Sequence, residues 1–229
     1  MRLGVIVTSP RLGNVGLQRR LDSYRRSVSS GTEVVLEKTT GGPDSTDSRY
    51  EELLAGPYII DAAKKLASKN VSAIIVNCFL DPAVGALREL FNLPVVGPGE
   101  ASILTSTMVG SSFSILTILD NGISIIEELV RKIGLSGRLA SVRALNMKPD
   151  ELESNSQRVE EVLVSQARSA VYGDGASVLV LGCTSPEIAF AAEKLSNSLK
   201  VPVINPVRAA VQMAESLARQ KLSSSRSAY

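Results

Sequence analysis

The chain of 229 residues contains no histidine, and this absence narrows the chemistry that it can perform. Histidine is the side chain that most often acts as a general base near neutral pH, and it is the commonest transition-metal ligand. Catalysis by a Ser-His-Asp triad or a Cys-His pair is therefore excluded.

The chain also lacks a strong net charge and a long apolar run. A total of 25 Lys and Arg against 23 Asp and Glu gives a net charge of +2, with no electrostatic case for binding nucleic acid or an anionic membrane. No stretch reaches the roughly 18 apolar residues that span a bilayer. Residues 1–8 form a short apolar run without a signal-peptide cleavage pattern, and two cysteines do not make a disulfide scaffold. We therefore expect a cytoplasmic protein.

Short apolar runs rich in β-branched residues predict strands that are buried on both faces, as in parallel sheets. The clearest of these runs are residues 3–8, 71–76, 113–119 and 177–181. Apolar residues at helical spacing lie between them, at residues 50–69, 123–133 and 158–171. Strands that alternate with helices predict an α/β fold.

The two halves of the chain carry the same features in the same order. In the first half an apolar strand leads to Cys78, and the segment 94–98 (PVVGP) follows. In the second half an apolar strand leads to Cys183, and the segment 202–206 (PVINP) follows. The matching positions are separated by about 105 residues. A repeat of several features in one order predicts two similar α/β lobes.

Each cysteine stands between a predicted strand and a predicted helix, at residues 82–91 and 186–199. Ligands of open α/β sheets bind at the carboxyl ends of strands, and a helix N-terminus favours a thiolate and lowers the cysteine pKa. We expect Asp81 to cap the first of these helices. A single cysteine is more often a small core residue, and a disulfide between the two is a further alternative. The matching positions favour two activatable thiols, one in each lobe.

Such a pair of thiols can invert a stereocentre. One thiolate removes a carbon-bound proton from one face, the opposite thiol delivers a proton to the other face, and N–H donors stabilise the intermediate enolate. The sequence has neither a P-loop nor a strand-borne G-x-G-x-x-G motif. We therefore expect neither a cofactor nor a metal.

Several segments carry the motifs of a known family. Residues 78–89 (CFLDPAVGALRE) are similar to the pattern C-F-x-D-P…A-x-R-E, and residues 94–101 (PVVGPGEA) to P-V-x-G-x-x-E-A. Residues 113–117 (FSILT) and 175–183 (GASVLVLGC) are similar to F-S-I-x-T and G-A…L-G-C. With these motifs the chain resembles the aspartate/glutamate/hydantoin racemase superfamily, and most closely its hydantoin racemase branch.

The resemblance implies two pseudo-symmetric, Rossmann-like α/β lobes with parallel sheets and an active site in the cleft between them. We expect residues 1–98 with 207–229 to form the first lobe and residues 99–206 the second. By resemblance, Cys78 and Cys183 are the catalytic residues. The substrate-binding residues implied in the same way are Thr8, Ser9, Pro10, Gly42, Pro43, Asn77, Phe79, Thr117, Gly182 and Thr184.

We therefore expect a cofactor-independent racemase that acts on 5-substituted hydantoins or allantoin-like ureides. An amino-acid racemase for aspartate or glutamate is an alternative, as is maleate isomerase or arylmalonate decarboxylase chemistry on the same scaffold. The decarboxylases use one cysteine, so the second cysteine argues against them. A pair of binding lobes without catalytic activity is a third class. We also expect a homo-oligomer that binds a small-molecule substrate and neither nucleic acid nor a membrane.

Overall fold

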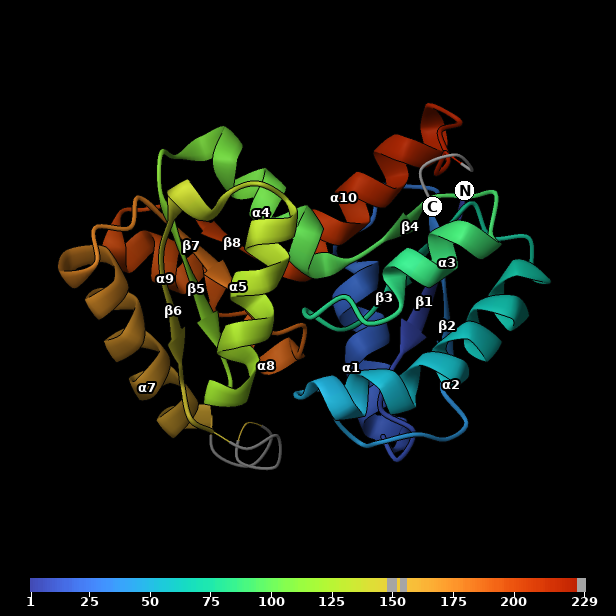
Figure 1. Cartoon of the computed structure of the whole chain (residues 1–229), viewed down its shortest axis with the longest axis horizontal. Coiled ribbons are helices and arrows are strands. Elements are labelled where there is room, and N and C mark those ends of the chain that lie inside the picture. Colours follow the sequence, from blue (N-terminus) through green and yellow to red (C-terminus); the bar gives the residue numbers. More distant parts are fainter. Residues whose placement is uncertain (148–151, 153–155, 226–229) are drawn as a thin grey trace. The chain divides into compact units, whose positions relative to one another are not determined.

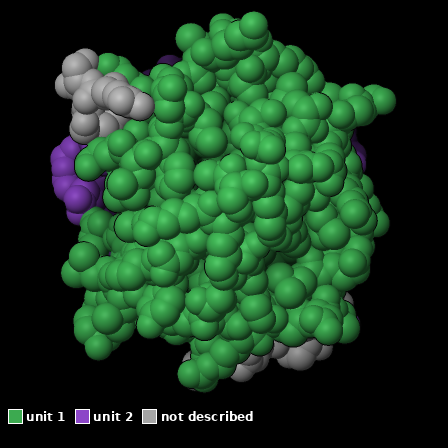
Figure 2. Space-filling view, turned by 90° about the vertical axis from the view of Figure 1, so that its right-hand side faces the viewer, with its two compact units in different colours: residues 1–98, 207–229 green, residues 99–206 purple. Residues whose placement is uncertain are grey.

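Two four-stranded sheets organise the part of the chain that the structure describes, which is residues 1–147, 152 and 156–225 of a computed structural model. Every strand pair in both sheets is parallel. The chain divides into unit 1, which is Met1–Pro98 with Val207–Tyr229, and unit 2, which is Gly99–Pro206 (Figure 2). The predicted α/β fold with two similar lobes built on parallel sheets is confirmed.

Unit 1 contains a sheet in the order β2-β1-β3-β4 with helices around it (Figure 1). Its strands are β1 (Arg2–Val7), β2 (Glu33–Lys38), β3 (Ala73–Val76) and β4 (Val95–Val96). Its helices are α1 (Asn14–Arg25), α2 (Arg49–Ala67), α3 (Val84–Leu90) and α10 (Pro206–Arg219).

Unit 2 repeats this arrangement with a sheet in the order β6-β5-β7-β8. Its strands are β5 (Phe113–Thr117), β6 (Leu139–Ala144), β7 (Val178–Leu181) and β8 (Val203–Ile204). Its α-helices among the described residues include α4 (Pro98–Val109), α5 (Ile123–Lys132), α7 (Ser156–Arg168), α8 (Pro186–Ala189) and α9 (Ala192–Leu199). Short helical turns are η1 (Asp120–Gly122), η2 (Ser136–Arg138) and the π-helix η3 (Ser169–Gly173). In Figure 1 the sheet of this unit lies between α7 and α5.

The interior strands of both sheets are the ones that the sequence predicts most clearly. β1 and β3 are interior in unit 1, and β5 and β7 are interior in unit 2. Their residues are buried at almost every position, since helices cover both faces. This burial explains why their sequences are continuous apolar runs.

Each unit buries its own hydrophobic core between its sheet and its helices. In unit 1, Leu66 of α2 and Leu87 of α3 pack in one cluster with Ile6 and Ile74 of the sheet, and all four are 0% exposed. In unit 2, Leu163 of α7 and Leu195 of α9 pack in one cluster with strand residues such as Leu179. Full burial of each large aliphatic side chain contributes about 1.5–3 kcal/mol.

The helices that follow the two cysteines differ from the predicted ones. The first begins at Val84, two residues later than predicted, because Ala83 before it has a left-handed backbone with φ of 59°. The second is interrupted after Ala189, so that α8 and α9 replace the single predicted helix. The local turns override the helical spacing in both places.

The last helix, α10, is fastened to unit 1 by a buried carboxylate. Glu215 is 0% exposed. It accepts hydrogen bonds from the Ser29 N–H at 3.0 Å, the Ser29 hydroxyl at 2.5 Å and the Thr32 hydroxyl at 2.6 Å. Burial raises the pKa of Glu215, but these hydrogen bonds and the charge of Arg219 outweigh burial, so that the pKa is lowered overall. The ionised carboxylate therefore stabilises the fold.

We expect Glu215→Ala to reduce the free energy of unfolding by about 2–4 kcal/mol, because it leaves a buried gap and removes the acceptor of three partly buried hydrogen bonds. Since the folded-state pKa is lowered, the contribution of Glu215 is complete above the ordinary glutamate pKa and declines as the pH falls through the folded-state value. Urea unfolding at a series of pH values measures both effects. The matched control is Glu127→Ala on the exposed face of α5, which should change stability by less than about 0.5 kcal/mol. Equal losses from the two variants would contradict this account.

Candidate functional site

Cys78 lies in the turn that follows β3 in unit 1. The pairing of β3 with β1 continues one residue beyond the strand, because the Asn77 N–H donates to the Ile6 carbonyl oxygen at 2.8 Å. The Cys78 N–H then donates to the Val76 carbonyl oxygen at 2.7 Å, which closes a tight turn. Cys78 therefore lies at the carboxyl end of an interior strand, where α/β sheets hold their ligands.

Cys183 has the equivalent position in unit 2, two residues beyond the end of β7. The Gly182 N–H donates to the Leu116 carbonyl oxygen at 2.7 Å, as Asn77 does in unit 1. A Cβ atom on Gly182 would lie only 2.8 Å from the same oxygen. Position 182 therefore requires glycine if Cys183 is to stay where it is.

A backbone N–H two residues beyond the cysteine acts on each sulfur. The Ser185 N–H donates to the Cys183 sulfur at 3.4 Å, and the Leu80 N–H lowers the pKa of the Cys78 thiol. Neither cysteine is in a disulfide, so both are free thiols.

Burial dominates the acidity of Cys78. It raises the pKa of the thiol to about 12, although the Thr46 hydroxyl and the Leu80 N–H lower it, and the carboxylates of Asp47 and Asp81 raise it as well. At neutral pH the sulfur of Cys78 is therefore protonated.

The prediction that a helix N-terminus lowers the pKa of Cys78 is wrong. The turn around Cys78 separates it from α3, which begins only at Val84. Ala83 is the N-cap residue of α3, so the expected capping position of Asp81 is wrong too. The Asp81 side chain instead lies against Gly97. A Cβ atom added to Gly97 would come within 2.2 Å of the Asp81 carboxyl carbon.

Asn77, a predicted substrate-binding residue, is held by a tyrosine that the sequence does not single out. The Tyr24 hydroxyl donates to Asn77 Oδ1 at 2.9 Å, and the two side chains are 1% and 5% exposed. Burial raises the pKa of Tyr24 well above its usual range, so the phenol stays protonated and remains a donor. Tyr24 lies on α1, 53 residues away in sequence, and no local motif marks it.

The other predicted substrate-binding residues of unit 1 also follow strand ends. β2, β1 and β3 are neighbours in the sheet. Residues of the loops after these three strands are Gly42 and Pro43, then Thr8, Ser9 and Pro10, and then Asn77 and Phe79. Phe79 is only 2% exposed, which favours a packing role over an open stacking surface. The fold thus gathers the predicted residues of this unit at one edge of one sheet.

The predicted residues of unit 2 have the corresponding placement. Thr117 is the last residue of β5, and Gly182 and Thr184 flank Cys183 beyond the end of the neighbouring strand β7. Thr117 and Thr184 are 3% and 7% exposed. These residues therefore belong to the carboxyl edge of the second sheet.

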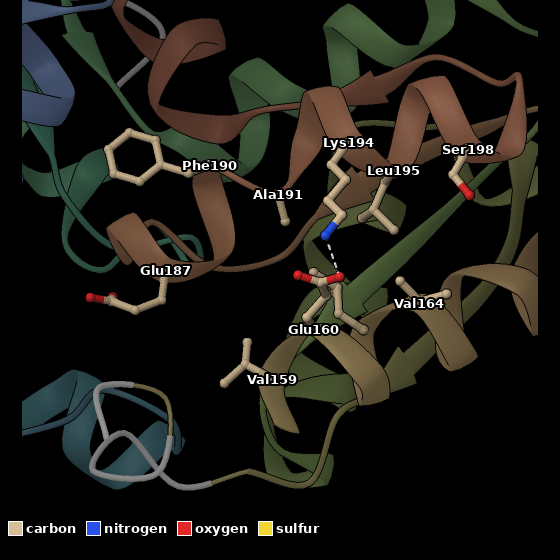
Figure 3. A pocket seen from close by; sticks show the side chains of 10 residues that line it. Val159, Glu160, Val164, Glu187, Phe190, Ala191, Lys194, Leu195 and Ser198 are labelled. Carbon is tan, nitrogen blue, oxygen red and sulfur yellow. Dashed lines mark hydrogen bonds and ion pairs between the residues drawn. The ribbon is translucent and has the colours of Figure 1, made fainter. Parts of the chain in front are cut away.

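A separate cavity of about 480 Å³ in unit 2 contains none of the predicted residues. It is lined by residues of α7, α8 and α9 and of the turn between the last two (Figure 3). An ion pair joins Glu160 and Lys194 beside an apolar surface that includes Leu163 and Leu195. The cysteines are not part of this cavity.

Within residues 1–147, 152 and 156–225, no group of three or more His, Cys, Asp or Glu side chains could hold a metal ion. Within the same residues, no helix is both long enough and apolar enough to cross a membrane. The structure thus adds no metal-ligand set to the candidate residues above.

Comparison with known proteins identifies the family of the chain. The family model described as Asp/Glu/hydantoin racemase matches residues 6–214. The chain belongs to this racemase family. Membership makes the protein an enzyme of the isomerase class, as the sequence motifs predict.

Individual members of the racemase family match almost the whole chain. A hydantoin racemase of Paenarthrobacter aurescens is 35% identical over 214 residues, which are 93% of this chain and 90% of the relative. An allantoin racemase structure from Pseudomonas fluorescens has a TM-score of 0.91 at 33% identity and covers 98% of this chain and 94% of its own. An allantoin racemase from Klebsiella pneumoniae has a TM-score of 0.90 at 30% identity, covering 98% and 90% of the two chains.

We expect Gly182→Ala to destabilise the racemase by about 1–3 kcal/mol, because its methyl group would overlap the Leu116 carbonyl oxygen. The midpoint of thermal unfolding measures the effect. Gly137→Ala in η2 is the matched control, since a Cβ atom there would meet nothing within 4 Å. If Gly182→Ala is as stable as Gly137→Ala, the turn before Cys183 does not require glycine.

Proposed function

We propose that this protein is a cofactor-independent racemase of 5-substituted hydantoins or allantoin-like ureides, with Cys78 and Cys183 as its two acid–base groups. One observation carries the proposal. The two cysteines of the chain lie at equivalent strand ends in two units of the same topology, two residues beyond the interior strands β3 and β7. The family and its hydantoin and allantoin racemases support the same chemistry.

The proposed reaction moves protons only. A thiolate takes the hydrogen from the stereocentre, so that the C–H bond breaks, an S–H bond forms and the electron pair remains on the substrate as an enolate. The other cysteine donates its proton to the opposite face of the same carbon and becomes the thiolate. No atom is oxidised or reduced, and one proton has been transferred between the two sulfurs for each inversion.

The acidity of Cys78 fits one half of this cycle directly. Because burial keeps its sulfur protonated at neutral pH, Cys78 begins as the proton donor for one enantiomer. Conversion of the other enantiomer requires Cys78 as the thiolate. The proposal therefore needs groups that can accommodate both protonation states of this sulfur.

The predicted substrate-binding residues favour a neutral ureide over a dicarboxylic amino acid. They are Thr, Ser, Pro, Gly, Asn and Phe, without any cationic side chain. Arg11, the residue next to the first of these loops, forms an ion pair with Asp44 at 2.9 Å. Aspartate and glutamate would bring carboxylates that need cationic partners, whereas the carbonyl and N–H groups of a hydantoin ring need only hydrogen bonds.

The proposal also concerns the compartment and the oligomeric state of the protein. Both cysteines must remain reduced, so the proposal places the protein in a reducing compartment such as the cytoplasm. The homo-oligomer expected from the sequence stays a prediction, which light scattering of the purified protein can test.

The substrate class is tested by incubating the enzyme with single enantiomers in D₂O. We expect loss of optical rotation and uptake of deuterium at the stereocentre for allantoin and 5-substituted hydantoins, because the hydrogen next to the ring carbonyl is acidic. Aspartate and glutamate should show neither change. Racemisation of the amino acids but not of the ureides would reverse the assignment of substrate.

The roles of the cysteines are tested by Cys78→Ser and Cys183→Ser. Each variant should lose net racemisation, because inversion needs both groups, and removal of an acid–base group costs about 10²–10⁴-fold in rate. Each should keep slow solvent exchange of one enantiomer, with opposite preferences, because one thiolate can still remove a proton that solvent returns to the same face. Deuterium incorporation into each pure enantiomer measures this, and the double variant gives the background. A single variant that racemises at the parent rate would remove its cysteine from the mechanism.

A further inference from the structure

Thr46 approaches the sulfur of Cys78 from the loop between β2 and α2. Its Oγ1 atom lies 3.0 Å from the Cys78 sulfur, and the residue is only 4% exposed. This distance is within hydrogen-bonding range of sulfur, and either atom can be the donor. The contact joins two segments that are 32 residues apart in sequence.

The loop holds Thr46 in place from both sides. Before it, the Ser45 hydroxyl donates to the Asp47 carboxylate and so bridges across Thr46. After it, Ser48 caps α2: its hydroxyl oxygen accepts from the Glu51 N–H at 3.3 Å and its O–H donates to the Glu51 carboxylate at 2.9 Å. A serine N-cap whose oxygen accepts from the third helical N–H stabilises the start of a helix. The hydroxyl of Thr46 is therefore presented to the sulfur by an ordered backbone.

A hydroxyl group suits a sulfur that changes its protonation state. It has one donor and two acceptor positions, so it can accept from the S–H of a thiol and donate to a thiolate after rotating about one bond. A backbone N–H, such as that of Leu80, can only donate. A partner that serves both states is what the proposed role of Cys78 requires.

Two carboxylates near the Cys78 sulfur disfavour its thiolate form, so a hydrogen-bond donor is needed to stabilise that form. The Asp47 and Asp81 carboxylates disfavour a negative charge on the sulfur, and the Tyr24 phenol is protonated by burial. Of the groups that favour the thiolate, the Thr46 hydroxyl has the largest effect, ahead of the Leu80 N–H.

We propose that Thr46 is a positioning residue for Cys78. The Thr46 hydroxyl stays hydrogen-bonded to the Cys78 sulfur in both protonation states and stabilises the thiolate form. This inference rests on the proposed acid–base role of Cys78. The hydrogen bond itself concerns the thiol alone, so it can be tested without any substrate.

The test uses Cys183→Ala as the background, which leaves Cys78 as the single thiol of the chain. The rate of alkylation by iodoacetamide is measured over a range of pH below the Cys78 pKa, where it follows the thiolate fraction. Thr46→Val, which keeps the shape and removes the hydroxyl, should slow alkylation about tenfold or more. Thr46→Ser should stay within about threefold of the background, since it keeps the hydroxyl. Thr46→Ala replaces Thr46→Val if the latter does not fold.

Thr39→Val is the matched control for this experiment. Thr39 is 2% exposed, and its hydroxyl oxygen has no hydrogen-bond partner among the residues that the structure describes. The same chemical change there should leave the alkylation rate of Cys78 unchanged. An alkylation rate of Thr46→Val equal to that of the background, or equal slowing by Thr39→Val, would overturn the inference.

Racemisation by the same Thr46 variants in the otherwise unchanged protein separates this inference from the proposed function. Thr46→Val should lower kcat for both enantiomers about tenfold, with KM less affected, and Thr46→Ser should restore kcat. If the protein racemises no ureide but the alkylation rates change as expected, the proposed function fails and the hydrogen bond stands. If racemisation is normal in Thr46→Val, Thr46 does not serve Cys78 in catalysis.

Discussion

One backbone hydrogen bond at the end of each sheet sets the position of the cysteine that follows it. In unit 1 it joins the Asn77 N–H to the Ile6 carbonyl oxygen, and in unit 2 the Gly182 N–H to the Leu116 carbonyl oxygen. Each bond extends a parallel ladder one residue past its strand, and the next residue is the cysteine. Because the donor is a main-chain group, the position accepts Asn in unit 1, but it demands Gly in unit 2, where a Cβ atom would lie 2.8 Å from the Leu116 carbonyl oxygen.

In the proposed mechanism, the environment of Cys78 lets an enzyme without histidine hold a proton at its acid–base group. Burial and two neighbouring carboxylates disfavour the thiolate, while a hydroxyl and a main-chain N–H favour it. Desolvation makes each of these contacts stronger than it would be in water. The effects that raise the pKa outweigh those that lower it, so the sulfur is protonated at neutral pH. The Thr46 hydroxyl and the Leu80 N–H can still stabilise the thiolate once the proton is transferred.

The sequence predicts those parts of the molecule whose structure is determined locally. The interior strands β1, β3, β5 and β7 are visible as apolar runs, because both of their faces are buried. The edge strands are harder to recognise: β2 and β6 carry charged residues and are only partly buried, while β4 and β8 are two residues long. The cysteines could be found because they recur in a repeat.

Contacts between distant segments could not be predicted in this way. Thr46 and Tyr24 reach Cys78 and Asn77 only after the sheet of unit 1 has formed, and no spacing rule connects them. Thr46 does lie close in sequence to the predicted residues Gly42 and Pro43, which is the one local hint. The pKa of Cys78 was mispredicted for a related reason, since it depends on a turn that displaces the start of α3.

The course of the chain also has a consequence for its synthesis. Unit 2 is one continuous segment, whereas unit 1 needs α10, whose Glu215 binds Ser29 and Thr32 near the beginning of the chain. Domains fold as units while the ribosome delivers the chain from its N-terminus. All four strands of unit 1 precede unit 2 in the chain, but its last helix follows unit 2. The contacts of Glu215 with Ser29 and Thr32 can therefore form only after the whole of unit 2 has been synthesised.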